Sequence, residues 1–207
     1  MAGDTSTAVL RRYLKRLGYN AYAWELGRNL GPKTVGEDGQ HLTARIQEIY
    51  EETGQKVSMV GWSLGGVLAR IAARIEPKKV RQVISLGSPF AGNPKSSNVW
   101  RVYEMMTKHK IDDESTRKKL AESKLPPIVP ATAIFTKGDG IVAWETCMES
   151  ESKITDNIQV YGSHCGLGVN SAVLYAVADR LALPDGEWKP FERSGLRRLV
   201  YPSAGHH

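Results

Sequence analysis

The sequence predicts a three-layer α/β domain, with helices covering both faces of a mostly parallel sheet. Two observations carry this prediction. Apolar, β-rich segments alternate along the chain with amphipathic helical segments, a pattern typical of parallel βαβ units. The length, 207 residues, suits one hydrophobic core. We therefore expect a single domain over residues 1–207, with an insertion at about 90–127 and a tail at 184–207.

The composition excludes several classes of protein. Hydrophobic residues make up 41% and charged residues 24%, which argues against a disordered, collagen-like or coiled-coil chain. No apolar run reaches the ~20 residues that span a bilayer, and no signal peptide opens the chain, so we expect a soluble protein of unknown compartment. A net charge of +6 favours a weak attraction to anionic lipid surfaces rather than nucleic acid as a partner.

The first half of the chain reads as alternating elements. An N-cap at Asp4-Thr5-Ser6 and leucines at helical spacing predict a first helix that Gly18 ends. The following elements are then expected in order: a strand at 19–26, a helix at 36–53, a strand at 56–62, a helix at 64–75 and a strand at 80–86.

The second half resumes this alternation after a break. Residues 89–130 are polar, are bracketed by prolines and contain helical segments. Strands are expected at 131–136 and 157–161, followed by a helix at 171–183 and a tail punctuated by Pro and Gly. The strands of both halves together predict the parallel sheet.

Ser63 is the candidate nucleophile. It is the centre of Gly61-Trp62-Ser63-Leu64-Gly65, which fits the G-x-S-x-G pattern of a tight turn between a strand and a helix. Such a turn exposes the serine Oγ beside the free N–H groups of the helix N-terminus. The bare pattern also fits an ordinary glycine-rich turn, but an apolar strand before it and a helix after it favour the nucleophile.

His164 is the candidate base, chosen by order and position. The pattern predicts an acid and then a histidine on loops that follow later strands. His41 precedes the serine, His109 lies between two lysines, and His206 and His207 end the chain. His164 follows an expected strand and precedes the last helix, between glycines at 162 and 166.

Asp139 is the candidate acid. It follows the strand at 131–136 and has glycine on both sides, which allows a tight turn. An Asp-Gly turn with no catalytic role is the alternative, and Glu145 and Asp156 are competing acids. In this assignment Ser63 attacks an acyl carbon, His164 takes the serine proton and then activates water, and Asp139 orients the imidazole.

These segments resemble the α/β-hydrolase superfamily, in its bacterial lipase and carboxylesterase branch. The resemblance rests on GWSLGG, RQVISLGSPFAG, FTKGDGIVAW and NIQVYGSHCGLGVNSAVLYAVADRL, and spans residues 5 to 183. It implies a parallel sheet, the triad Ser63, Asp139 and His164, and hydrolysis of carboxylic esters without a cofactor. It also implies that the N–H of Leu64 is one oxyanion-hole donor. A metal site is not expected, because no His/Asp/Glu cluster in the sequence has ligand spacing.

The chain departs from this resemblance at its start. Members of the family usually begin with an apolar strand and a turn that supplies the second oxyanion donor, whereas this chain begins with a helix. We expect a half-formed oxyanion hole unless residues 1–3 complete it, and a sheet edge that is exposed or covered by another chain. An exposed sheet edge would also allow two or more chains to associate into an oligomer through that edge.

Further residues around the expected site have two interpretations each. The insertion at 90–127 is either a mobile lid over an acyl pocket or a solvated helical segment. Cys147 and Cys165 either form a disulfide between the acid and base loops or are two separate thiols. Trp62 and Trp144 either line an acyl pocket or pack in the core.

Three functions fit the sequence. The first is a serine esterase or lipase that acts on an ester or lipid substrate through an acyl-enzyme. The second is an acyltransferase with the same triad, in which an alcohol replaces water. The third is a weakly active or non-catalytic scaffold that lacks the second oxyanion donor.

Overall fold

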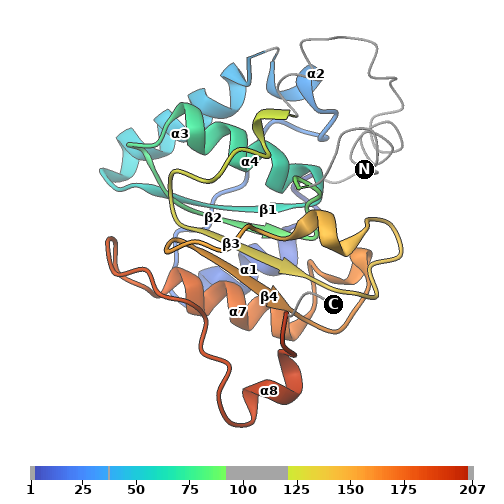
Figure 1. Cartoon of the computed structure of the whole chain (residues 1–207). Helices are drawn as coiled ribbons and strands as arrows, with labels where there is room; N and C mark the ends of the chain where they lie inside the picture. Colours follow the sequence, from blue (N-terminus) through green and yellow to red (C-terminus); the bar gives the residue numbers. More distant parts are fainter. Residues whose placement is uncertain (1–2, 37, 92–120, 205–207) are drawn as a thin grey trace.

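Four parallel strands form the centre of the computed structural model, which describes residues 3–36, 38–91 and 121–204 (Figure 1). The strands lie in the sheet order β1-β2-β3-β4. Their bounds are Val57–Trp62 for β1, Val80–Leu86 for β2, Ala131–Phe135 for β3 and Thr155–Gln159 for β4. Each strand pairs in parallel with the next, which confirms the predicted parallel sheet.

Helices cover both faces of this sheet. Figure 1 shows α3 (Gln40–Thr53) and α4 (Leu64–Ile75) on one face, and α1 (Ala8–Arg16) and α7 (Ser171–Leu181) on the other. The neighbouring β2 residues Val83 and Ile84 lie in two different core clusters, as alternating strand side chains must. This arrangement confirms the predicted three-layer α/β architecture.

The remaining elements are short. They are α2 at Pro32–Val35, the 3₁₀ turns η1 at Trp144–Cys147 and η2 at His164–Gly166, and α8 at Arg197–Val200. None of the helices in the described ranges is long and apolar enough to cross a membrane.

The strand predicted at 19–26 is wrong, because this segment has no ladder partner in the part of the chain that the structure describes. Its backbone is held by other groups: Tyr19 N donates to Leu14 O at 3.1 Å, and Trp24 N donates to Oδ1 of Asp4 at 3.1 Å. β-rich composition supplies side chains that suit a sheet, but a strand also requires a neighbour.

The last strand lies two residues earlier than predicted. β4 covers Thr155–Gln159, whereas the sequence suggested 157–161. An aromatic residue such as Tyr161 favours a strand in the sequence, but Tyr161 lies after β4 and its exposed fraction is 64%. Asp156 lies inside β4, opposite Thr132 of β3. Its carboxylate accepts hydrogen bonds from the tail, namely from Phe191 N at 2.8 Å and from the Arg193 guanidinium at 2.8 Å.

Residues 92–120 of the insertion lie outside the described residues, so the lid and the solvated-helix interpretations stay predictions. The two flanks of the insertion meet at a buried arginine of α4. The Arg70 guanidinium lies 4.0 Å over the Phe90 ring on one flank. On the other, its Nε donates to Ser123 O at 2.8 Å, and it forms a buried ion pair with Glu149.

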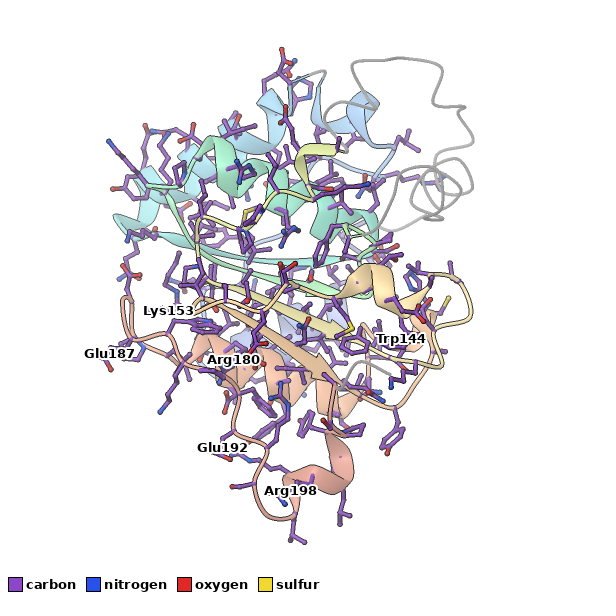
Figure 2. The ribbon with its side chains drawn as sticks, viewed as in Figure 1. Trp144, Lys153, Arg180, Glu187, Glu192 and Arg198 are labelled. Carbon is purple, nitrogen blue, oxygen red and sulfur yellow. The ribbon has the colours of Figure 1, made fainter. Side chains whose placement is uncertain are left out.

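The tail packs against α7. The rings of Phe191 and Tyr201 lie edge to face at 4.7 Å, and both residues belong to the core cluster of the α1 and α7 face. Arg180 projects from α7 beside this segment, and Arg198 lies on α8 farther from the sheet (Figure 2). Phe191 and Tyr201 of the tail therefore pack into the same core cluster as α7.

Candidate active site

Ser63 occupies a tight turn between β1 and α4. Its φ of 54° is unusual for a residue other than glycine, and its side chain is buried. The backbone N–H of Ser63 donates to Leu86 O at 2.8 Å, which anchors the turn to β2. The positive φ of Ser63 agrees with the strained turn that the sequence pattern predicts, whereas the burial of its side chain differs from the expected exposure of Oγ.

The glycines of the turn have different roles. A Cβ on Gly61 would lie 2.5 Å from the backbone of Gly65, so the close approach of strand and helix requires glycine there. A Cβ on Gly65 would meet no atom within 4 Å, whereas one on Gly66 would lie 2.1 Å from Oγ of Ser88. On the helix side the sterically required glycine is therefore Gly66 and not Gly65.

The structure brings Asp139 and His164 together. Nδ1 of His164 lies 2.7 Å from Oδ2 of Asp139, and the two side chains are buried. The backbone adds a second link, since His164 N donates to Asp139 O at 3.0 Å. Both residues follow strands, Asp139 after β3 and His164 after β4, so they meet at the carboxyl end of the sheet as predicted.

The surroundings of Asp139 favour a carboxylate. Burial alone would raise the pKa of Asp139, but hydrogen bonds from His164 and from the N–H groups of Val142 and Ile141 outweigh it and hold the pKa below its ordinary value. The two backbone donors lie 2.6 and 3.0 Å from Oδ1. Because an ionised carboxylate only accepts hydrogen bonds, Nδ1 of His164 carries the proton and Nε2 is the basic nitrogen.

Trp62 links the serine turn to the histidine loop. Its indole N–H donates to the backbone O of His164 at 3.2 Å, and the two ring centroids lie 6.4 Å apart. A Cβ on Gly168 would lie 2.8 Å from the indole ring. Since Trp62 directly precedes Ser63, this contact places the nucleophile and base candidates at one end of the sheet.

Gly87 is a site residue that the sequence reasoning missed. Its φ is +53°, and a Cβ there would lie 3.2 Å from Nδ1 of His164 and 3.3 Å from Oδ2 of Asp139. The available signal was its position directly after β2, at the same end of the sheet as the three candidates.

The competing residues do not join this pair. Glu145 is exposed, and the carboxylate of Asp156 binds Phe191 N and Arg193. His41 is exposed on α3, with Nδ1 3.0 Å from Thr34 O. His109, His206 and His207 lie outside the described residues. Among the described residues no group of three His, Cys, Asp or Glu side chains is arranged to hold a metal ion.

Leu64 begins α4 directly after Ser63. The first N–H groups of a helix have no acceptor within the helix, and the positive end of the helix dipole lies there. The Leu64 N–H therefore stays the candidate for an oxyanion donor. The sequence predicts a half-formed oxyanion hole unless residues 1–3 complete it. Met1 and Ala2 lie outside the described residues, and the N–H of Gly3 donates to Oγ of Ser6 at 3.1 Å.

Of the two interpretations of Cys147 and Cys165, the structure favours separate thiols. Cys147 is buried, Cys165 is exposed, and both are free thiols. Burial raises the pKa of the Cys147 thiol, and the neighbouring Asp139 carboxylate adds to this effect. Sequence proximity to Asp139 and His164 did not bring the two sulfurs into one environment, because Cys147 packs inward with Phe135 and Met148.

The two tryptophans pack against other residues. Trp62 belongs, partly buried, to the core of the α1 and α7 face. Trp144 stacks on Phe135 with ring centroids 5.7 Å apart, and Figure 2 shows it near the end of the sheet toward which the strands point. These contacts favour packing over the acyl-pocket interpretation.

The fold and this site define an α/β-hydrolase. A family model described as the PGAP1-like alpha/beta domain matches residues 39–158, more than half of the chain. The chain therefore belongs to the PGAP1-like alpha/beta domain family, within the α/β-hydrolase superfamily that the sequence motifs resemble.

Solved structures share this fold at low sequence identity. One is a structure from a description of LipS and LipT, two metagenome-derived lipolytic enzymes. It is 15% identical over 86% of this chain and 89% of that chain, with a TM-score of 0.57. A pyrethroid hydrolase from Sphingobium faniae JZ-2 is 15% identical over 88% of this chain and 94% of that chain, with a TM-score of 0.56. No curated protein matches the chain.

Proposed function

We propose that this chain is a serine hydrolase that cleaves carboxylic esters through an acyl-enzyme. The observation that carries the proposal is the buried hydrogen bond between His164 and Asp139, at the end of the sheet where Ser63 lies on a strained turn. A histidine held by a carboxylate at Nδ1 presents a basic Nε2, which is what a serine hydroxyl needs to become a nucleophile. The neighbours described as lipolytic enzymes and a pyrethroid hydrolase support the same class.

The residues act in two half-reactions in this proposal. Oγ of Ser63 attacks the acyl carbon, Nε2 of His164 takes the hydroxyl proton, and the same proton passes to the departing alcohol. Water then attacks the acyl-serine while His164 accepts its proton and returns one to Oγ. Asp139 stabilises the imidazolium in both steps, and the N–H of Leu64 donates to the oxyanion.

A short-chain nitrophenyl ester tests the proposal. The wild-type chain is expected to release a burst of nitrophenol as the acyl-enzyme accumulates, and Ser63→Ala to abolish it. Ser85→Ala is the matched control, because Ser85 is also buried, on the neighbouring strand β2, and it should keep the burst. Equal release by wild type and Ser63→Ala would contradict the proposal, and no burst from either protein would leave a non-catalytic scaffold.

The same ester substrate shows whether water or an alcohol accepts the acyl group from Ser63. Product analysis with an added alcohol is expected to yield mainly free acid. A new ester as the main product would instead identify an acyltransferase that uses the same three residues.

A further inference from the structure

Two loops leave neighbouring strands side by side: the acid loop, residues 136–143, after β3, and the histidine loop, residues 160–170, after β4. The last backbone hydrogen bond of this strand pair joins Val160 N to Phe135 O at 2.9 Å. Both strands end there, so contacts other than the β-ladder set the distance between the two loops.

The hydroxyl of Thr136 bridges the two loops at the point where the ladder ends. Its Oγ1 donates to Gly162 O at 3.0 Å, and the same oxygen accepts from Gly138 N at 3.2 Å. Thr136 is buried, with an exposed fraction of 1%. A hydroxyl has one proton to donate and two lone pairs that accept. This one group therefore ties the histidine loop to the acid loop and also holds the turn of the acid loop.

The backbones of the two loops touch at the same point. A Cβ on Gly138 would lie 2.8 Å from Gly162 O and 3.7 Å from Oγ1 of Thr136. The carbonyl oxygen of Gly162 thus lies between the Thr136 hydroxyl and the bare backbone of Gly138. Because neither glycine has a side chain, the hydroxyl of Thr136 supplies the directional contact between the loops here.

The histidine loop is fastened on its other side to α7. Nδ2 of Asn170 donates to Tyr161 O at 2.8 Å, and Oδ1 of the same side chain accepts from Ala172 N at 2.9 Å in the first turn of the helix. Asn170 therefore fixes this loop to α7, whereas Thr136 fixes it to the acid loop.

The bond between Asp139 and His164 lies just beyond this bridge. Asp139 follows Thr136 by three residues, and His164 follows Gly162 by two. Nδ1 of His164 lies 2.7 Å from Oδ2 of Asp139, and a hydrogen bond weakens steeply as its distance and angle depart from the optimum. A change in the spacing of the loops would therefore reach this bond directly.

We propose that Thr136 is a positioning residue: its hydroxyl holds the histidine loop at the distance from the acid loop at which the imidazole of His164 meets the carboxylate of Asp139. The effect on rate rests on the proposed ester hydrolysis, whereas the effect on the position of the imidazole does not.

Thr136→Val tests the proposal, because valine has nearly the shape of threonine and lacks the hydroxyl. Thr132→Val is the matched control: Thr132 lies on β3, its exposed fraction is also 1%, and its hydroxyl has no hydrogen-bond partner in the described part of the chain. With a nitrophenyl ester, Thr136→Val is expected to lower kcat about 5- to 30-fold and to leave KM within about twofold. Thr136→Ser keeps the hydroxyl and should recover most of kcat, and Thr132→Val should match wild type.

The proton on Nδ1 of His164 gives a second readout that needs no substrate. A strongly hydrogen-bonded imidazole N–H resonates far downfield in the proton NMR spectrum, and hydrogen bonding to a carboxylate strengthens the bond. The resonance is identified by its absence in His164→Gln. It is expected in wild type, Thr136→Ser and Thr132→Val, and in Thr136→Val it should move upfield and exchange with water at least about tenfold faster.

The two measurements separate this proposal from ester hydrolysis. A changed resonance in Thr136→Val, with no nitrophenol burst from any of the proteins, would support the positioning role and contradict ester hydrolysis. A burst in wild type, with kcat and the resonance unchanged in Thr136→Val, would overturn the positioning role and support ester hydrolysis. Lower stability of Thr136→Val in urea with an unchanged resonance would show that the hydroxyl serves the fold alone, and would also overturn the proposal.

Discussion

A Cβ atom on Gly87 would lie 3.2 Å from Nδ1 of His164 and 2.7 Å from Cδ1 of Leu167, a residue that has no exposed surface. The backbone directly after β2 thus lies against the hydrogen-bonded pair of His164 and Asp139. The absence of a side chain at Gly87 leaves the space in which the imidazole meets Asp139.

Gly87→Ala is therefore expected to displace His164 and lower kcat for a nitrophenyl ester by about 10- to 100-fold. The positive φ of Gly87 also makes alanine strained by about 1–2 kcal/mol. Gly195→Ala is the control, because Gly195 has a similar φ of +58° and its Cβ would meet no atom within 4 Å. Equal activity of the two variants would show that Gly87 is needed for its backbone conformation and not for the space beside His164.

Asp139→Asn is expected to lower kcat and to change how the stability of the fold depends on pH. Asparagine at position 139 would hold the imidazole of His164 in the wrong tautomer, which lowers kcat by up to about 10⁴-fold. The folded pKa of Asp139 lies below its unfolded value of about 3.9, so the stability that its carboxylate contributes is full above about pH 4 and is lost as pH falls through the folded pKa. Urea unfolding should show a gap between wild type and variant that narrows below pH 4; a constant gap would contradict this linkage.

Arg70→Met is expected to destabilise the domain by about 3–5 kcal/mol, because it leaves the buried Glu149 carboxylate without its partner. Replacing both residues by methionine should recover most of that loss. Arg74→Met, one turn farther along α4, removes a more exposed arginine that donates to Pro126 O at 2.9 Å and should cost much less. Urea denaturation of wild type, Arg70→Met, Glu149→Met, the double variant and Arg74→Met measures these differences, and losses of the two single variants that add up in the double variant would argue against a coupled pair.

Trp62→Phe is expected to loosen the histidine loop, since it removes the indole N–H that donates to His164 O. Loss of one such hydrogen bond costs about 1 kcal/mol, and the shift of His164 should lower kcat more than it raises KM. Trp24→Phe also removes an indole N–H, which donates to Gly27 O at 2.9 Å in an exposed loop. A kcat for Trp62→Phe equal to that of Trp24→Phe would show that Trp62 does not position the base.

The spacing of apolar residues predicted correctly those helices and strands in which the apolar positions are also the buried ones. The α4 helix at Leu64–Ile75 and the β2 strand at Val80–Leu86 have the predicted bounds, because in each the apolar pattern coincides with burial. Asp139 and His164 could be paired from the sequence because parallel strands place their following loops at one end of the sheet.

The rest depends on contacts between distant residues. The segment at 19–26 has strand composition but no neighbour, and sequence composition does not report whether a neighbour exists. Arg70 reads as a polar position of a helix, yet it is buried by Phe90, Ser123 and Glu149 from three other parts of the chain. The choice between a disulfide and two separate thiols depended on such contacts too, since spacing to catalytic candidates does not fix the direction of a side chain.

The two thiols are expected to react at very different rates. Cys165 is exposed, whereas Cys147 is 1% exposed and burial raises the pKa of its thiol, which lowers the fraction of reactive thiolate. Without reductant, Ellman's reagent should titrate about one thiol in the folded chain and both of the two cysteines in guanidinium chloride. Cys165→Ser should remove the rapid reaction and leave the slow one, and Cys147→Ser should do the opposite. No reactive thiol in denaturant would show that the two cysteines are bridged, and two rapid thiols in the folded chain would contradict the burial of Cys147.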